Sequence, residues 1–267
     1  MAVGVRDGSE QVTGGNFLRT GATLVEVAVV APTIEQMKTI LGFDDPKEPG
    51  SPVDTDEKGN PRVRIDVWIQ RPEDKFQTKI AFFLVKADSV ASTGKIEWVN
   101  NKGQFCYGPK DGGDPNYEWF DLEGARKAFQ GERTFINWLR ALTNHKGGKT
   151  ADDMYLDTWD AIFAGNFAEI NSIITAANQK GNRFGMLFGV RTSAEGKQYQ
   201  GVYMKLFTRQ YGNLFGEFQG SLNGEYGAYK HDYQNSLVWQ PYGGNATVGT
   251  PEGATAAGSD DGAAPWK

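Results

Sequence analysis

Residues 183–207 constrain the fold of this chain most strongly, because they form two predicted β-strands joined by a turn at residues 192–196. Apolar residues alternate with other residues along both strands, which is typical of strands with one buried face. The side chains predicted to face the core are Phe184, Met186, Phe188 and Val190, then Val202, Met204 and Leu206. The opposite face carries cations, aromatic rings and glycines, and the glycines would let a flat ligand approach the backbone.

A second stretch shows the same alternation over two more predicted strands, residues 62–70 and 77–85. Its inward positions are Val63, Ile65, Val67, Ile69, Ile80, Phe82 and Leu84. Its outward positions again combine cations with rings. Rings that stack on bases and cations that contact phosphates are the components of a single-stranded nucleic acid site. We therefore predict a DNA-binding face made of Arg62, Arg64, Trp68, Lys79, Phe83, Arg183, Arg191, Lys197, Tyr199, Tyr203, Lys205 and Phe207.

An alternative interpretation applies to each ring taken singly. Aromatic side chains often pair across neighbouring strands, cover glycines or lie buried beneath other elements. The DNA-binding prediction therefore depends on the face as a whole rather than on any one ring.

The remaining elements complete a mainly β chain. A strand is predicted over residues 23–30, a short helix over 33–41, a loop over 44–61 and a third hairpin over 95–99 and 103–107. Apolar residues at helical spacing predict helices over 132–143 and 167–177, within a helical insertion at about residues 121–177. These elements fit a small Greek-key barrel of the OB type, and a β-sandwich with a helical insertion fits as well.

The chain is expected to consist of three parts. Residues 1–22 are a flexible N-terminus, residues 23–242 one OB-like DNA-binding domain, and residues 243–267 a disordered, glycine- and alanine-rich tail that is weakly acidic. The sequence contains no apolar run as long as the roughly 18 residues of a membrane span. The single cysteine, Cys106, fits a reducing cytosol and is predicted to be a buried strand residue.

The formal net charge of -5 argues against a protein that coats DNA with a uniformly basic surface. The positive charge is local, because residues 62–110 hold nine Lys and Arg against five Asp and Glu, and residues 183–242 hold six against four. Residues 151–182 hold one against five. The predicted strands are thus the basic regions, as a binding face requires.

Three other motifs do not predict a catalytic or metal site. Residues 145–150, HKGGKT, end like a phosphate-binding loop, but Thr143 stands where that motif needs glycine and no strand precedes it. Carboxylates that could hold a metal for nuclease chemistry occur at Asp152, Asp153, Asp157 and Asp160, but helix capping and a solvated acidic surface explain them more simply. Zinc-site spacing is absent from Cys106, His145 and His231. We therefore expect a non-enzymatic protein without metal or cofactor.

Three segments carry a resemblance to a known family: VRIDVWIQRPEDKFQTKIAFFL at residues 63–84, GERTFINWLRAL at 131–142 and GMLFGVRTSAEGKQYQGVY at 185–203. They resemble single-stranded DNA-binding proteins of tailed bacteriophages, including the large phages of gut Bacteroidetes, over roughly residues 23–207. The resemblance implies a protein that coats and protects single strands during phage DNA replication and recombination, in the cytoplasm of the infected bacterium. It implies no catalytic residues.

The end of the chain departs from a pattern common among bacterial proteins with that function. Those proteins often end in an acidic tail with a hydrophobic tip that recruits replication enzymes, whereas this chain ends with Asp260, Asp261, Pro265, Trp266 and Lys267. Single-stranded DNA is the expected partner, and no membrane is expected. Recruitment of phage replication proteins by the tail and self-association stay open. A virion or assembly protein, packing through the aromatic, glycine-rich residues 211–242, is the alternative function.

Overall fold

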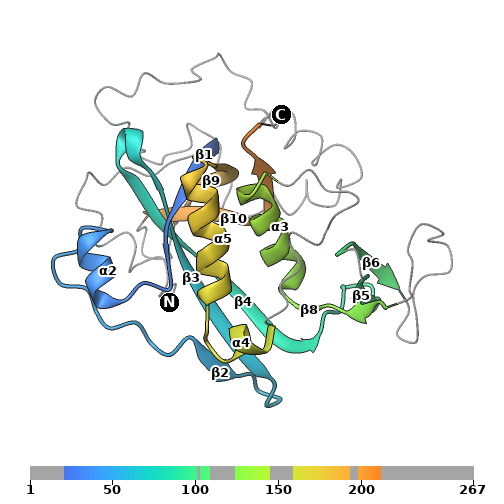
Figure 1. Cartoon of the computed structure of the whole chain (residues 1–267). Coiled ribbons are helices and arrows are strands. Elements are labelled where there is room, and N and C mark those ends of the chain that lie inside the picture. The colour runs from blue at the N-terminus through green and yellow to red at the C-terminus, as the bar shows by residue number, and fades with distance from the viewer. Residues whose placement is uncertain (1–20, 101–102, 109–123, 145–158, 193–197, 212–267) are drawn as a thin grey trace.

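The computed structural model describes residues 21–100, 103–108, 124–144, 159–192 and 198–211 (Figure 1). They form a curled antiparallel sheet, or half-barrel, with helices against one face and a separate three-stranded sheet beside one of these helices. The prediction of a mainly β chain with a few helices is confirmed. The predicted tail lies outside the described residues, as do most of the N-terminal part and residues 212–242.

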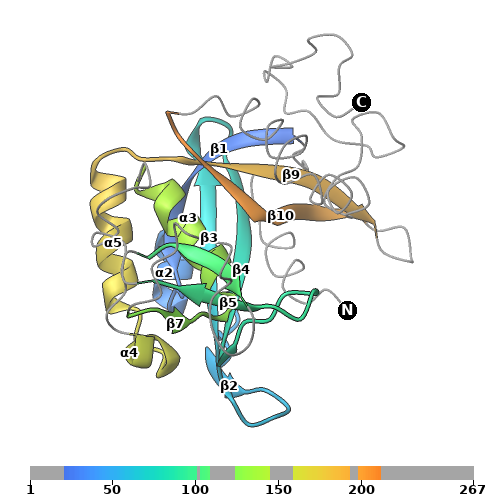
Figure 2. The ribbon, with the colours of Figure 1, turned by 90° about the vertical axis from the view of Figure 1, so that its right-hand side faces the viewer.

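The main sheet has the strand order β10-β9-β1-β3-β4-β8, and β2 pairs with β3. Strands β1, β3 and β4 are consecutive antiparallel neighbours, and β9 returns after a long connection to pair with β1, which is the Greek-key order. Figure 2 shows β9 and β10 running across the direction of β3 and β4, which gives the sheet its curl. The strand bounds are β1 (Gly21–Val30), β2 (Val53–Thr55), β3 (Pro61–Arg71), β4 (Phe76–Asp88), β8 (Phe129–Gln130), β9 (Phe184–Thr192) and β10 (Gln198–Arg209).

The two main predicted hairpins are confirmed, and in β3 and β4 the alternation that predicted them is confirmed as well. In β3 and β4 the inward positions are buried in one core: Val63, Ile65, Val67, Ile69, Ile80, Phe82 and Leu84. Phe184, Met186 and Phe188 of β9 join the same core. We call the face that they form the inner face of the sheet, and the opposite face the outer face.

Helices α3 (Glu132–Leu142), α4 (Trp159–Phe163) and α5 (Ala168–Gln179) cover the inner face. The rings of Phe135 and Trp138 on α3 lie 5.2 and 4.8 Å from the ring of Phe82, centroid to centroid. The predicted helices are confirmed, and their apolar residues belong to the same core as the sheet. The reason is that α3 has a broad apolar face, which it buries against the apolar face of the sheet.

The start of α3 is held close to β4. Gly131 precedes the helix with a φ of +83°, and a Cβ at this position would lie 2.1 Å from the carbonyl oxygen of Phe83. Because only glycine fits both the conformation and the space, the helix start is fixed against the strand that carries Phe83.

The connection between β1 and β3 crosses the outer face. Helix α2 (Ile34–Thr39) opens with a capping box at Thr33, and the chain then places Leu41 and Phe43 over Trp68. A register shift in β1 between Val27 and Val29 turns Val29 to the same side, where it completes this small outer cluster. Part of the outer face is therefore covered by the protein itself.

The hairpin predicted over residues 95–107 is confirmed, but it belongs to a separate small sheet of order β6-β5-β7. Its strands are β5 (Ile96–Val99), β6 (Phe105–Gly108) and β7 (Arg126–Lys127). Five short elements were not predicted: β2 within the expected loop 44–61, the 3₁₀-helix η1 (Pro72–Asp74) between β3 and β4, and β7, β8 and α4 within the expected insertion. Each has two to five residues, too few for a periodic pattern to be read from the sequence.

Candidate nucleic-acid interface

The exposed part of the outer face centres on Phe83 of β4, whose residue surface is 52% exposed. Arg64 lies directly opposite on β3, and its guanidinium carbon is 5.6 Å from the centroid of the Phe83 ring. Arg62 occupies the next outward position of β3. We call Arg62, Arg64 and Phe83 the outer patch. It combines one accessible ring with two half-exposed arginines, as the sequence predicted.

Both arginines of the outer patch are already paired with carboxylates. Arg62 makes two hydrogen bonds to Asp54 of β2, Nε to Oδ1 at 2.7 Å and Nη2 to Oδ2 at 2.5 Å. Arg64 Nε lies 2.6 Å from Oδ1 of Asp66. The hydrogen bond from Arg62 lowers the pKa of Asp54 below its ordinary 3.8, and the same contact raises the pKa of Arg62. Asp54 is therefore ionised at neutral pH.

Trp68 and Lys79 lie on the outer face, but neither offers a free binding surface. Trp68 is only 2% exposed, because Phe43 covers it edge-on with the ring centroids 5.0 Å apart. Lys79 Nζ lies 5.9 Å from the Trp68 ring centroid and 3.4 Å from Oδ2 of Asp66. The prediction that Trp68 is accessible for stacking is wrong, since the β1–β3 connection folds over it.

Arg183 lies at the far end of the outer face, just before β9. It forms a hydrogen bond with Glu73, and its Nε is 3.7 Å from Oε2 of Glu26 on β1. A hydrogen bond from its own backbone amide is the main cause that lowers the pKa of Glu73, and Arg183 lowers it further. This predicted cation too is neutralised by neighbouring carboxylates.

The remaining predicted binding residues lie in β9, in β10 and between these strands. Tyr203 is buried, at 4% exposure. Phe207 faces the core, with its ring centroid 6.0 Å from that of Phe82, because a register shift between Tyr203 and Thr208 reverses the alternation. Both were predicted to be accessible, and this is wrong. Phe207 was also predicted to face outward, whereas it packs against the core. Arg191, Tyr199 and Lys205 lie in β9 and β10 but their side chains are not described, and Lys197 lies outside the described residues.

Among the side chains that the structure describes, the predicted cations face an equal number of carboxylates. Arg62, Arg64, Lys79 and Arg183 meet Asp54, Asp66, Glu26 and Glu73. Asp66 occupies an outward position in the predicted strand, so its pairing with Arg64 and Lys79 could have been predicted. Asp54 stands in a segment predicted as a loop, so its position beside Arg62 was not.

A second group of cations and rings was missed by the sequence analysis. Arg133 and Arg140 of α3 meet Phe105 and Tyr107 of β6. The available signal was the seven-residue spacing of the arginines on one predicted helix and the two-residue spacing of the rings on one predicted strand. The residues are far apart in the sequence, so their contact could not be read from it.

The candidate catalytic and metal-binding residues are not gathered into a site in the described part of the chain. Asp160 forms an ion pair with Lys86, with a 2.6 Å contact, while Asp152, Asp153 and Asp157 lie outside the described residues. Residues 145–150 and His231 also lie outside them. Cys106 is buried in β6, as predicted. The described residues include no group of three or more His, Cys, Asp or Glu arranged to hold a metal. Nor do they contain a helix long and apolar enough to span a membrane.

Comparisons with protein-family models, curated proteins and solved structures give no match for this chain.

The two outer-face rings should differ sharply in what they contribute to stability. Trp68→Ala is expected to lower the free energy of unfolding by about 3–5 kcal/mol, because it empties a buried site beneath Phe43. Phe83→Ala is expected to cost less than about 1 kcal/mol, because the ring is half exposed. Urea unfolding followed by circular dichroism measures both, and equal losses would contradict these assignments.

Proposed function

We propose that this protein binds single-stranded DNA without sequence preference, through the outer face of β3 and β4. The observation that carries the proposal is the exposed ring of Phe83 with Arg64 directly across the strand pair and Arg62 one position further along. A ring can stack on any base, and arginine can contact the adjoining phosphates. The proposed role is to coat and protect single strands during phage DNA replication and recombination in the host cytoplasm, without catalysis.

The topology supports an OB-type assignment for the half-barrel. The sheet neighbours β1, β3 and β4 are followed in the chain by the small sheet, β8 and the helices. Then come β9, which pairs with β1, and β10, which pairs with β9. Strand β10 also contacts β4, through rings such as those of Phe207 and Phe82. In OB folds the face of the second and third strands binds oligonucleotides, and under the proposed assignment these strands are β3 and β4.

The carboxylates of Asp54 and Asp66 lower the expected affinity for DNA, because they already pair with the two arginines of the outer patch. A phosphate that contacts Arg62 must replace Asp54, and one that contacts Arg64 must replace Asp66. Exposed ion pairs contribute little to stability and exchange readily, so this replacement is feasible, but it reduces the net gain. We therefore propose that stacking supplies specificity for single strands and that the carboxylates limit the affinity.

Binding of a fluorescently labelled oligo-dT, measured by anisotropy over a salt series, tests the proposed function. We expect binding that weakens as salt rises and a much weaker response to a duplex. Phe83→Ala should weaken oligo-dT binding by about 1–3 kcal/mol, roughly 5- to 150-fold. Anisotropy is preferred to tryptophan quenching because Trp68, Trp138 and Trp159 are buried.

Val90→Ala is the matched control, since Val90 is also an exposed apolar residue, at 55%, and lies outside β3 and β4. Its affinity should equal that of the wild type. Absence of binding by the wild type at low salt would refute the proposal, and stable self-association in the same samples would favour a virion or assembly protein.

Removing the carboxylate beside Arg62 should strengthen binding. Asp54→Asn frees the guanidinium for a phosphate, so affinity should rise, and the slope of log K against log salt should steepen by about 0.7 for the added contact. Lowering the pH from 8 to 6 should not imitate the variant, because the lowered pKa of Asp54 keeps this carboxyl ionised over that range. Asp45→Asn removes the same charge from another exposed site and serves as control. An equal rise in affinity for both variants would show a general charge effect and contradict the role given to Asp54.

A further inference from the structure

A second cluster of arginines and rings lies on the side of α3 that faces the small sheet. Arg133 and Arg140 are seven residues apart, about two helical turns, and therefore lie on one side of the helix. The guanidinium carbon of Arg133 is 5.2 Å from the ring centroid of Phe105 and 4.6 Å from that of Tyr107. The corresponding carbon of Arg140 is 5.9 Å from the Phe105 centroid. We call these four residues the α3 cluster.

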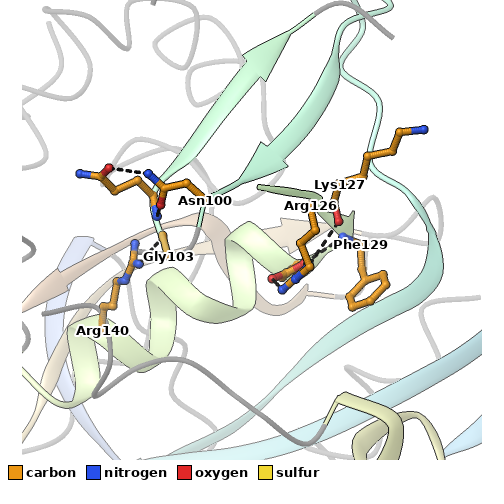
Figure 3. Close-up of polar contacts among 8 residues, drawn as sticks. Asn100, Gly103, Arg126, Lys127, Phe129 and Arg140 are labelled. Atoms are coloured by element: carbon orange, nitrogen blue, oxygen red, sulfur yellow. Dashed lines mark hydrogen bonds and ion pairs between the residues drawn. The ribbon is translucent and has the colours of Figure 1, made fainter. Parts of the chain in front are cut away.

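Hydrogen bonds hold the two arginines in place. Arg133 is hydrogen-bonded to Glu97 of β5. Arg140 reaches from α3 to the turn between β5 and β6, where its Nη2 donates to the carbonyl oxygen of Gly103 at 2.6 Å (Figure 3). The rings of β6 lie against the guanidinium groups, an arrangement that orders arginine side chains before any ligand arrives.

The α3 cluster has more positive charge than the described residues neutralise. Its two guanidinium groups meet one carboxylate, that of Glu97, and Arg140 forms no ion pair within the described part of the chain. In that same part, Arg133 Nη2 and Arg140 Nε find no hydrogen-bond acceptor. Burial, and secondly the charge of Arg133, lower the pKa of Arg140. Two cations that are partly removed from water without enough counter-charge favour the arrival of an anion.

We propose that the α3 cluster binds a phosphate group, carried either by a DNA strand or by a free phosphate compound. A phosphate oxygen accepts hydrogen bonds from more than one guanidinium, and arginine is the side chain best matched to this geometry. The site does not depend on the outer patch, because none of its residues belongs to β3 or β4. The phosphate site can therefore be tested independently of the proposed function.

Thermal unfolding of the full-length protein in inorganic phosphate, against chloride at equal ionic strength, tests the site. Phosphate should raise the melting temperature of the wild type and of Lys180→Gln, which removes one positive charge from an exposed position after α5, outside both clusters. It should not raise that of Arg140→Gln. The comparison is between the phosphate-dependent shifts, so a change in basal stability does not affect it.

Two further measurements test the geometry of the site and identify the source of the phosphate. Arg140→Lys keeps the charge but loses the planar fork, and it should retain only part of the phosphate shift. If oligo-dT affinity falls about tenfold in Arg140→Gln, the phosphate belongs to a DNA strand; an unchanged affinity with a lost shift assigns the site to a free phosphate compound. The proposal would be overturned by any of three results. These are equal phosphate-dependent shifts of the melting temperature in the wild type and Arg140→Gln, no such shift in the wild type, or a shift of the same size when succinate replaces phosphate.

Discussion

Packing of α3 against the inner face of the sheet is the interaction on which the other features depend. The ring of Phe82 lies between β4 and α3, in contact with Phe135 and Trp138, and the same group of rings extends to Phe184 of β9. Because successive side chains of a strand point to opposite faces, burial of Phe82 and Leu84 places Phe83 on the outer face. A slip of one residue would exchange the buried and exposed sets. The accessible ring of the proposed interface is thus fixed by the core behind it.

The charges of the outer face fit a protein that is acidic overall and is proposed to bind a polyanion. The described cations of this face are paired with carboxylates from neighbouring positions, so the free protein presents little net charge there. Exposed pairs of this kind can exchange partners at low cost. We therefore propose that the accessible ring of Phe83 discriminates between single strands and duplexes, and that the arginines make binding depend on salt.

The sequence predicted the strands of the main sheet well, because long alternating segments such as residues 62–70 carry a strong period-two signal. It could not predict which outward rings stay accessible. Trp68 is covered by Phe43 of the β1–β3 connection and by Val29, which a bulge in β1 turns to that side, and Phe207 is turned inward by a register shift. Neither irregularity has a signature in local composition. The pairing of Arg62 with Asp54 could not be predicted either, because β2 has only three residues and so shows no periodic pattern.

The most direct test of the central claim is to map where a bound single strand touches the protein. Oligo-dT carrying a photoreactive iododeoxyuridine is cross-linked by ultraviolet light to the full-length protein, and the modified peptides are identified by mass spectrometry. We predict cross-links within β3 and β4, with Phe83 as a principal site, and loss of those cross-links in Phe83→Ala. Binding of the oligonucleotide with cross-links confined to other parts of the chain would contradict this prediction.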